Sequence, residues 1–267
     1  MFGKGEPSSG KRQQVIAWFG LALLIAAFVW LQLLPDGPRV WKPPGPTVKS
    51  EDGLGVVIID PGHGGQDSGT MHAGILEKDL ALDVARRVER LLQAKAVSTV
   101  MTRTGDHYIS LAGRAASANR ERDGVFVSIH FDEAKPTAAG VETYYAAHQA
   151  PRFPMIASWV PFLQTASTAE ENFESQSLAG FVQEALVAKT QAINRGTRAE
   201  QFFVIANVRH PAVLVEGGFL TNKDDVSKLT TETYREQLAD AIADGVLRYR
   251  EVVRQRQLTP VRSGPST

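Results

Sequence analysis

The chain has 267 residues, of which 43% are hydrophobic and 22% charged, an ordinary composition for one folded domain with additional segments. Its 29 lysines and arginines balance its 29 aspartates and glutamates, so no excess positive charge indicates binding to nucleic acid, and no such partner is expected. The absence of cysteine excludes disulfides, thiolate nucleophiles and cysteine-rich metal sites.

The first segment with a clear signal is the uncharged apolar run from Val15 to Leu34, which has the length needed to cross a bilayer core. Lys4, Lys11 and Arg12 precede it, and no small-residue cleavage site follows it. A buried core helix is the alternative, but a helix that is apolar all round at this end of a chain favours a membrane span. We therefore expect an uncleaved, single-pass signal anchor in the inner membrane.

The anchor divides the rest of the chain. By the positive-inside rule, residues 1–14 stay in the cytoplasm, and the domain lies in the periplasm or another extracytoplasmic space. Residues 35–53 are rich in proline and are expected to form a stiff, solvated linker. Residues 54–253 are expected to form one domain, and residues 254–267 have the composition of a disordered tail.

Within the domain, short apolar runs typical of strands alternate with amphipathic helical patterns. This alternation predicts an α/β fold with a largely parallel or mixed sheet. Strands are expected at 56–60, 97–103, 124–130, 140–146, 202–207 and 212–218, and helices at 77–95, 110–121, 177–193 and 234–253.

Residues with metal-binding or acid–base chemistry follow several of these strands. His63 comes just after the first strand, and His130 and Glu216 end later ones, while Glu77 opens the helix after the first strand. Carboxyl ends of strands in open α/β sheets are where ligands bind. Two imidazoles and one carboxylate form the ligand set of a catalytic zinc, and a further carboxylate can move a proton. A single strand-end histidine is usually structural, but two such histidines together with two carboxylates at one edge indicate a site.

The sequence also resembles a known family. The blocks "IDPGHGGQDSGT", "EKDLALDVA", "SLAGRAASAN", "VSIHFDEA", "GVETYY" and "PAVLVEGGFLTN" occur in an order similar to that in the zinc-dependent N-acetylmuramoyl-L-alanine amidases of the Amidase_3 type. The resemblance covers nearly the whole domain. It implies a mixed, mostly parallel six-stranded sheet flanked by helices. It further implies that His63, Glu77 and His130 bind Zn²⁺, that Glu216 is catalytic, and that the substrate is the amide between N-acetylmuramic acid and L-alanine in peptidoglycan.

Four more residues are candidates for contacts with the substrate or with the zinc ligands. Asp60 and Asp67 flank the first histidine, although turn chemistry explains both equally well. Arg114 is placed either to bind a substrate carboxylate or to form an ion pair at the edge of the core. Asp132 stands where the family usually has asparagine, and it either orients the second histidine or is a solvated loop residue.

Two other functions remain open at this point. A non-catalytic domain that binds peptidoglycan would keep the fold without turnover, although loss of at least one of the four site residues would then be expected. A generic zinc peptidase or esterase would need the same residues. The products of peptidoglycan digestion separate these alternatives.

The segment from Ala146 to Gln176 is long for a connection between a strand and a helix. It combines an apolar part with the glutamates Glu170, Glu171 and Glu174. In division-associated members of the resembling family, an insertion at this point carries a helix that blocks the zinc site with a glutamate until a partner removes it. The segment is therefore either such a gate, released by an activator protein, or a wall of the substrate groove.

Overall fold

The computed structural model describes residues 55–72, 74–133, 135–149 and 172–258. The signal anchor expected at 15–34, the linker at 35–53 and most of the tail lie outside these ranges. No helix in the described part of the chain is long and apolar enough to span a membrane. The chain divides into two compact units, Met1–Pro46 and Thr47–Thr267, and all of the described residues belong to the second.

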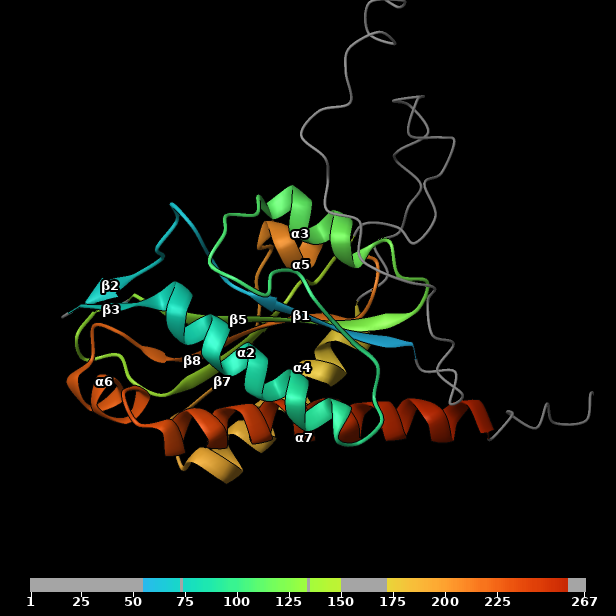
Figure 1. Cartoon of the computed structure of the whole chain (residues 1–267). Coiled ribbons are helices and arrows are strands. Elements are labelled where there is room, and N and C mark those ends of the chain that lie inside the picture. The colour runs from blue at the N-terminus through green and yellow to red at the C-terminus, as the bar shows by residue number, and fades with distance from the viewer. Residues whose placement is uncertain (1–54, 73, 134, 150–171, 259–267) are drawn as a thin grey trace, which may run out of the picture. The chain divides into compact units, whose positions relative to one another are not determined.

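A six-stranded sheet forms the centre of this unit, and its strand order is β4-β1-β5-β8-β6-β7 (Figure 1). Neighbouring strands are parallel except for β6 and β8, which are antiparallel. The prediction of a mixed, mostly parallel six-stranded sheet is therefore confirmed. The strands are β1 (Val56–Pro61), β4 (Thr99–Met101), β5 (Gly124–Asp132), β6 (Val141–Tyr145), β7 (Asn194–Ala199) and β8 (Ala212–Phe219).

Helices cover both faces of the sheet, which explains why its central strands are apolar without alternation. All six residues of β1 and all eight of β8 are buried, as expected for strands that are covered on both sides. On one face lie α2 (Glu77–Gln93), α4 (Phe173–Thr190) and α7 (Glu232–Leu258), and on the other lie α3 (Leu111–Ala118) and α5 (Phe203–Ala206) (Figure 1). The helix α6 (Lys223–Leu229) follows β8, and the short strands β2 (Met71–His72) and β3 (Ile75–Leu76) precede α2.

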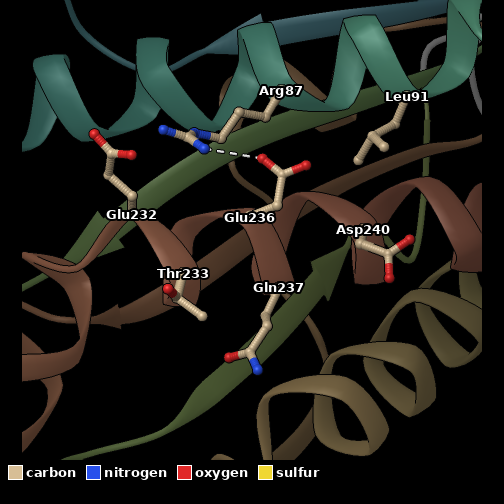
Figure 2. Close-up of a pocket in the computed structure, with 7 residues that line it drawn as sticks. All are labelled: Arg87, Leu91, Glu232, Thr233, Glu236, Gln237 and Asp240. Carbon is tan, nitrogen blue, oxygen red and sulfur yellow. Dashed lines mark hydrogen bonds and ion pairs between the residues drawn. The ribbon is translucent and has the colours of Figure 1, made fainter.

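Ion pairs join α2 to α7 at the surface of the first layer. Arg87 of α2 binds Asp83 on its own helix and Glu236 on α7, and Figure 2 shows the second of these contacts. Arg90 also binds Glu236, while Arg235 of α7 binds Asp83. A hollow of about 590 Å³ lies beside this network, and both helices contribute to its lining. These contacts fix the position of α2, the helix on which Glu77 lies.

Two predictions about the elements need correction. The run 202–207 is not a strand. Phe202 precedes the short helix α5, which takes up most of the run. Val204 and Ile205 are buried, while Phe202 and Phe203 are exposed. The sixth strand is instead β7, whose residues are mostly polar and exposed, since it lies at the edge of the sheet. The last helix, α7, continues to Leu258, five residues beyond the expected domain boundary at 253.

Candidate active site

His63 reaches the carboxyl edge of the sheet on a tight loop after β1. Its own backbone has a φ of 57°, in the left-handed region that residues other than glycine rarely adopt. Two glycines allow the loop to pack closely against the rest of the site. A Cβ on Gly62 would lie 2.3 Å from Cε1 of His130, and one on Gly69 would lie 2.4 Å from Oε2 of Glu77. The glycines therefore leave the space that the neighbouring site residues fill.

Three side chains converge in front of this loop: His63, Glu77 and His130. Oε1 of Glu77 lies 3.0 Å from Nε2 of His63 and 2.9 Å from Nδ1 of His130. The two imidazole rings meet edge to face with centroids 4.9 Å apart, and one donor atom from each of the three residues lies within 4.8 Å of the others. We call these residues the His–Glu–His cluster. Residues 67 positions apart in sequence are thus brought together as the sequence predicted.

Glu77 is held in the cluster by the backbone as well as by the imidazoles. Its Oε2 accepts a hydrogen bond from the amide of Thr70, and its Oε1 accepts one from the amide of Phe131. Burial favours the neutral acid, but hydrogen bonds and charge interactions with His130 and His63 outweigh burial and hold the pKa of Glu77 well below its ordinary value. The carboxyl group is therefore present as a carboxylate, the form that ligates metals.

Asp67 contacts the cluster directly. Its Oδ1 lies 2.9 Å from Nδ1 of His63 and also accepts a hydrogen bond from the amide of Gly69. Burial works against ionisation, but the Gly69 amide and His63 lower the pKa of Asp67. An ionised Asp67 accepts the Nδ1 proton of His63, so Nε2 is the nitrogen that faces Glu77 and would ligate a metal. The Gly69 contact is turn chemistry, and the His63 contact allows Asp67 to orient the histidine as well, so Asp67 has both of the expected contacts.

Asp60 and Arg114 lie beneath the site and pair with each other. Oδ1 of Asp60 lies 2.8 Å from Nη1 of Arg114, and both side chains are buried. Thr102 and Ser128 donate hydrogen bonds to the same carboxylate. Arg114 also donates to the carbonyl of His63 at 2.6 Å. The core-edge ion pair is therefore the correct reading of Arg114, and its guanidinium holds the loop that carries the histidine.

Arg103, which the sequence did not single out, has a similar supporting role. It follows β4 and is almost completely buried. Its guanidinium donates hydrogen bonds to the carbonyls of Pro61, Gly62 and Lys78, and so joins the histidine loop to the first turn of α2. The only signal in the sequence was its place at the carboxyl end of a strand.

Glu216 lies beside the cluster on the neighbouring strand. In the register of β5 and β8 it is paired with His130, so both side chains point to the same face. The carboxyl group is buried, and its Oε2 has no hydrogen-bond partner among the described residues. Burial first, and then the charges of Glu77, Asp132 and Glu142, raise the pKa of Glu216 well above its ordinary value. It is therefore a carboxyl group that readily holds a proton.

Asp132 ends β5 at the same edge. Its carboxylate accepts a hydrogen bond from the amide of Glu133 at 2.6 Å, and no contact within the described residues joins it to His130. The prediction that it orients this histidine is therefore not supported. Burial and the nearby carboxylates of Glu77 and Glu142 raise the pKa of Asp132.

The cluster and Glu216 share one cavity of about 520 Å³, within the range of small-molecule sites. Its lining also includes the polar residues Thr70, Asp132 and Glu133 and the apolar residues Leu111, Phe202, Phe203, Val204 and Leu214. Two imidazoles, an ionised carboxylate and a protonatable carboxyl group at the edge of an α/β sheet form the residue set of a mononuclear metal hydrolase.

Comparisons with known proteins agree with this class. The family model described as N-acetylmuramoyl-L-alanine amidase, Amidase_3, matches residues 57–248, and the chain belongs to this family. Protein YqiI of Bacillus subtilis is 35% identical over 193 residues, which cover 72% of this chain and 84% of YqiI. N-acetylmuramoyl-L-alanine amidase LytC of the same organism is 36% identical over 196 residues, but these span only 35% of LytC.

Solved structures show the same fold. The N-acetylmuramoyl-L-alanine amidase from Clostridium difficile 630 superposes with a TM-score of 0.62 at 36% sequence identity. The match covers 73% of this chain and 96% of that one, so almost all of the solved domain has a counterpart here. The family and enzyme class that the sequence implied are therefore confirmed.

Most of the segment 146–176 lies outside the described residues, but its two ends do not. The amide of Asn172 donates to the carbonyl of Ala147, and its side chain donates to the carbonyl of Ala146. Glu174 lines a different cavity, together with Gly124 at the opposite end of β5 from the His–Glu–His cluster. Glu174 is therefore not the glutamate of a gate in this structure, and the gate prediction depends on residues 150–171.

Proposed function

We propose that the chain is a zinc-dependent hydrolase that cleaves the amide between N-acetylmuramic acid and L-alanine in peptidoglycan. The observation that carries this proposal is the His–Glu–His cluster in one cavity with the buried carboxyl group of Glu216. Family membership supports the choice of bond, since the matched family is named for this amidase activity. A non-catalytic wall-binding domain would have no need for a carboxyl group that holds a proton beside the cluster.

The donor atoms of the cluster fit a zinc ion. In a tetrahedral site with bonds of about 2.0–2.1 Å, ligand atoms lie about 3.3 Å apart. Oε1 of Glu77 is 3.0 Å from one imidazole nitrogen and 2.9 Å from the other. Two neutral imidazoles and one carboxylate are also ligands that zinc prefers. His63, Glu77 and His130 would therefore hold the metal, and Asp67 would orient His63 from behind.

Other residues of the chain would transfer a proton or hold the site in place. A metal held by the cluster would polarise the amide carbonyl and activate a water molecule for attack. Glu216 is positioned to accept the proton of the attacking water at Oε2 and to pass it to the departing amine of L-alanine. Arg114 and Arg103 keep the histidine loop in place from below.

Digestion of purified peptidoglycan tests the proposal. The released material is labelled at its free amino termini and analysed by mass spectrometry, with Glu216→Gln as the inactive control. Stem peptides that begin with L-alanine, without new reducing sugar ends, are the expected products. Cleavage elsewhere in the stem peptide would instead indicate a generic zinc peptidase, and binding without cleavage would indicate the wall-binding alternative.

We also propose that residues 15–34 anchor the enzyme in the inner membrane as a single-pass segment, with the catalytic domain outside the cytoplasm. The support is the uncharged apolar run, the basic residues before it and the proline-rich linker after it. The full-length protein is expected in the membrane fraction after alkaline extraction, whereas a variant without residues 1–46 is expected in the soluble fraction. A mature protein whose amino terminus lies after Leu34 would refute the anchor.

A control by an activator protein is proposed for the segment between Ala146 and Gln176. If this segment blocks the site, deletion of residues 150–168 raises basal activity on peptidoglycan in a folded, zinc-loaded enzyme. The ends of the segment are joined by the Asn172 contacts, so the deletion leaves its base intact. Unchanged or lower activity would leave the groove-wall function.

A further inference from the structure

Five apolar residues line the active-site cavity together with its acidic residues. Three of these apolar side chains are exposed: Leu111 of α3 by 53%, Phe202 by 42% and Phe203 by 47%. Val204 and Leu214 are buried beneath them, and all five line the cavity of the His–Glu–His cluster. We call Leu111, Phe202 and Phe203 the apolar shelf. Exposed apolar side chains gathered beside polar groups in one cavity are typical of a ligand-binding surface.

The apolar shelf is held in position by contacts from three elements. The ring of Phe202 packs edge to face against Tyr144 of β6, with centroids 5.1 Å apart. The carbonyl of Phe203 accepts hydrogen bonds from both the backbone and the side chain of Asn207. Asn119, which caps α3, donates to the carbonyl of Asn207 and so joins α5 to α3. A surface ordered in advance loses little conformational entropy when a ligand binds to it.

The charges around the cavity indicate which part of a substrate the shelf accepts. Among the described residues, those that line the cavity include the carboxylic acids Asp132 and Glu133 but neither lysine nor arginine. A carboxylate placed against the shelf would therefore be desolvated with no lysine or arginine among these described residues to pair with it. The shelf suits a ligand part that is neutral and has an apolar face.

We propose that the apolar shelf binds the muramoyl half of the substrate, with the C–H face of the sugar ring and the lactyl methyl group against Phe202 and Phe203. This inference rests on the proposed amidase function. The lactyl carboxyl is bonded in the scissile amide, so the muramoyl half carries no ionisable group, whereas the stem peptide carries free carboxylates. The shelf and the cluster lie in one cavity, which allows a single substrate to contact both.

Two measurements test the proposal with zinc-loaded, full-length enzyme. The first is the hydrolysis of N-acetylmuramoyl-L-alanyl-D-isoglutamine by the wild type, Phe202→Ala and Phe203→Ala. We expect each variant to raise KM by about fivefold, because aromatic contacts contribute roughly 1 kcal/mol, and to change kcat less. The matched control is Phe173→Ala, since Phe173 is 64% exposed at the start of α4 and does not line the cavity. Thermal unfolding of each variant verifies the fold.

The second measurement is saturation-transfer NMR with the same ligand on Glu216→Gln, which binds without rapid turnover. The strongest transfer is expected at the sugar-ring and lactyl methyl protons, and Phe203→Ala in this background should weaken it while Phe173→Ala should not. Phe203→Leu, which keeps an apolar side chain but removes the aromatic ring, should also weaken transfer to the protons of the sugar ring.

The outcomes separate this inference from the proposed function. If the wild type hydrolyses the ligand but the shelf variants match it in KM, or transfer is strongest at the peptide protons, the muramoyl assignment is overturned while the amidase function stands. If the wild type does not hydrolyse the muramoyl amide at all, both fail together.

Discussion

At the scale of single residues, Glu216 is the side chain on which the proposed chemistry depends most. We predict that Glu216→Gln keeps the fold and the bound zinc but lowers kcat by about 10²–10⁴-fold, the usual contribution of a general acid–base group. The check is kcat on a muropeptide together with zinc content and thermal unfolding. Glu184→Gln, at an exposed position of α4, is the matched control. A Glu216→Gln enzyme with wild-type turnover would remove the assigned role.

Asp67 is expected to act through His63 rather than on the substrate. Asp67→Asn loses the charge that holds the proton of His63 on Nδ1, so zinc affinity should fall by about 10–100-fold while the fold is kept. Competition with a chromophoric chelator measures the affinity. Asp224→Asn, at an exposed position in α6, serves as the control. Equal zinc affinity in wild type and Asp67→Asn would show that the hydrogen bond does not tune the metal site.

Arg114 is predicted to contribute to the stability of the fold, and to activity only as a consequence. Arg114→Ala leaves the buried carboxylate of Asp60 without its partner, which typically costs about 3–5 kcal/mol of unfolding free energy. Urea denaturation of the metal-free protein measures the change. The exposed Arg120→Ala, two positions after α3, should change stability by no more than about 0.5 kcal/mol. A similar effect for both variants would contradict the buried ion pair.

At the scale of elements, the contact between α2 and α7 should depend on pH. Burial opposes ionisation of Asp83, but hydrogen bonds and charge interactions with Arg87 and Arg235 lower its pKa below 3.8. A carboxyl group with a lowered pKa stabilises the fold above its unfolded pKa, and this stabilisation disappears as the pH falls through the folded value. Asp83→Asn should therefore cost less than about 1 kcal/mol at pH 7, because the site is partly exposed, and nothing at an acidic pH below the folded pKa.

Urea unfolding of wild type and Asp83→Asn at both pH values measures this difference. The exposed Asp123→Asn, before β5, is the control and should show no such pH-dependent loss. A stability difference that persists at low pH would mean that packing, rather than charge, joins the two helices at this point.

Individual strands and helices could be predicted from the sequence where burial determines which residue types they contain. The apolar strands β1, β5 and β8 and the helices α2 and α7 could be recognised because their patterns reflect what they bury. The edge strand β7 could not, since an exposed strand carries no apolar pattern. The run 202–207 resembles a strand because residues 202–205 are all apolar. In the structure two of these side chains are exposed and two are buried, and the residues lie at the start of a short helix.

The same reasoning separates the predictable part of the site from the rest. His63, His130 and Glu216 could be placed together because carboxyl ends of parallel strands meet at one edge. The resemblance, rather than spacing, assigned Glu77 to the metal. Which face Arg114 and Arg103 would approach depends on tertiary packing, which no local pattern records.

At the scale of the whole molecule, the two faces of the sheet have different tasks. The layer of α2, α4 and α7 covers the larger apolar core and holds α2 in place, while α3 and α5 build the apolar side of the active-site cavity (Figure 1). The match covers 96% of the amidase from Clostridium difficile 630, so both layers of helices belong to the fold that the two proteins share.

The proposed function requires that zinc bound at the His–Glu–His cluster drives cleavage of the muramoyl amide. The most direct test is the rate at which metal-free enzyme exposes new L-alanine amino termini in purified peptidoglycan as zinc is added. The rate is predicted to start near zero and to rise with zinc until one equivalent per chain is bound, with no such rise in His130→Ala. Full activity in the metal-free enzyme, or no L-alanine termini at any zinc concentration, would contradict it.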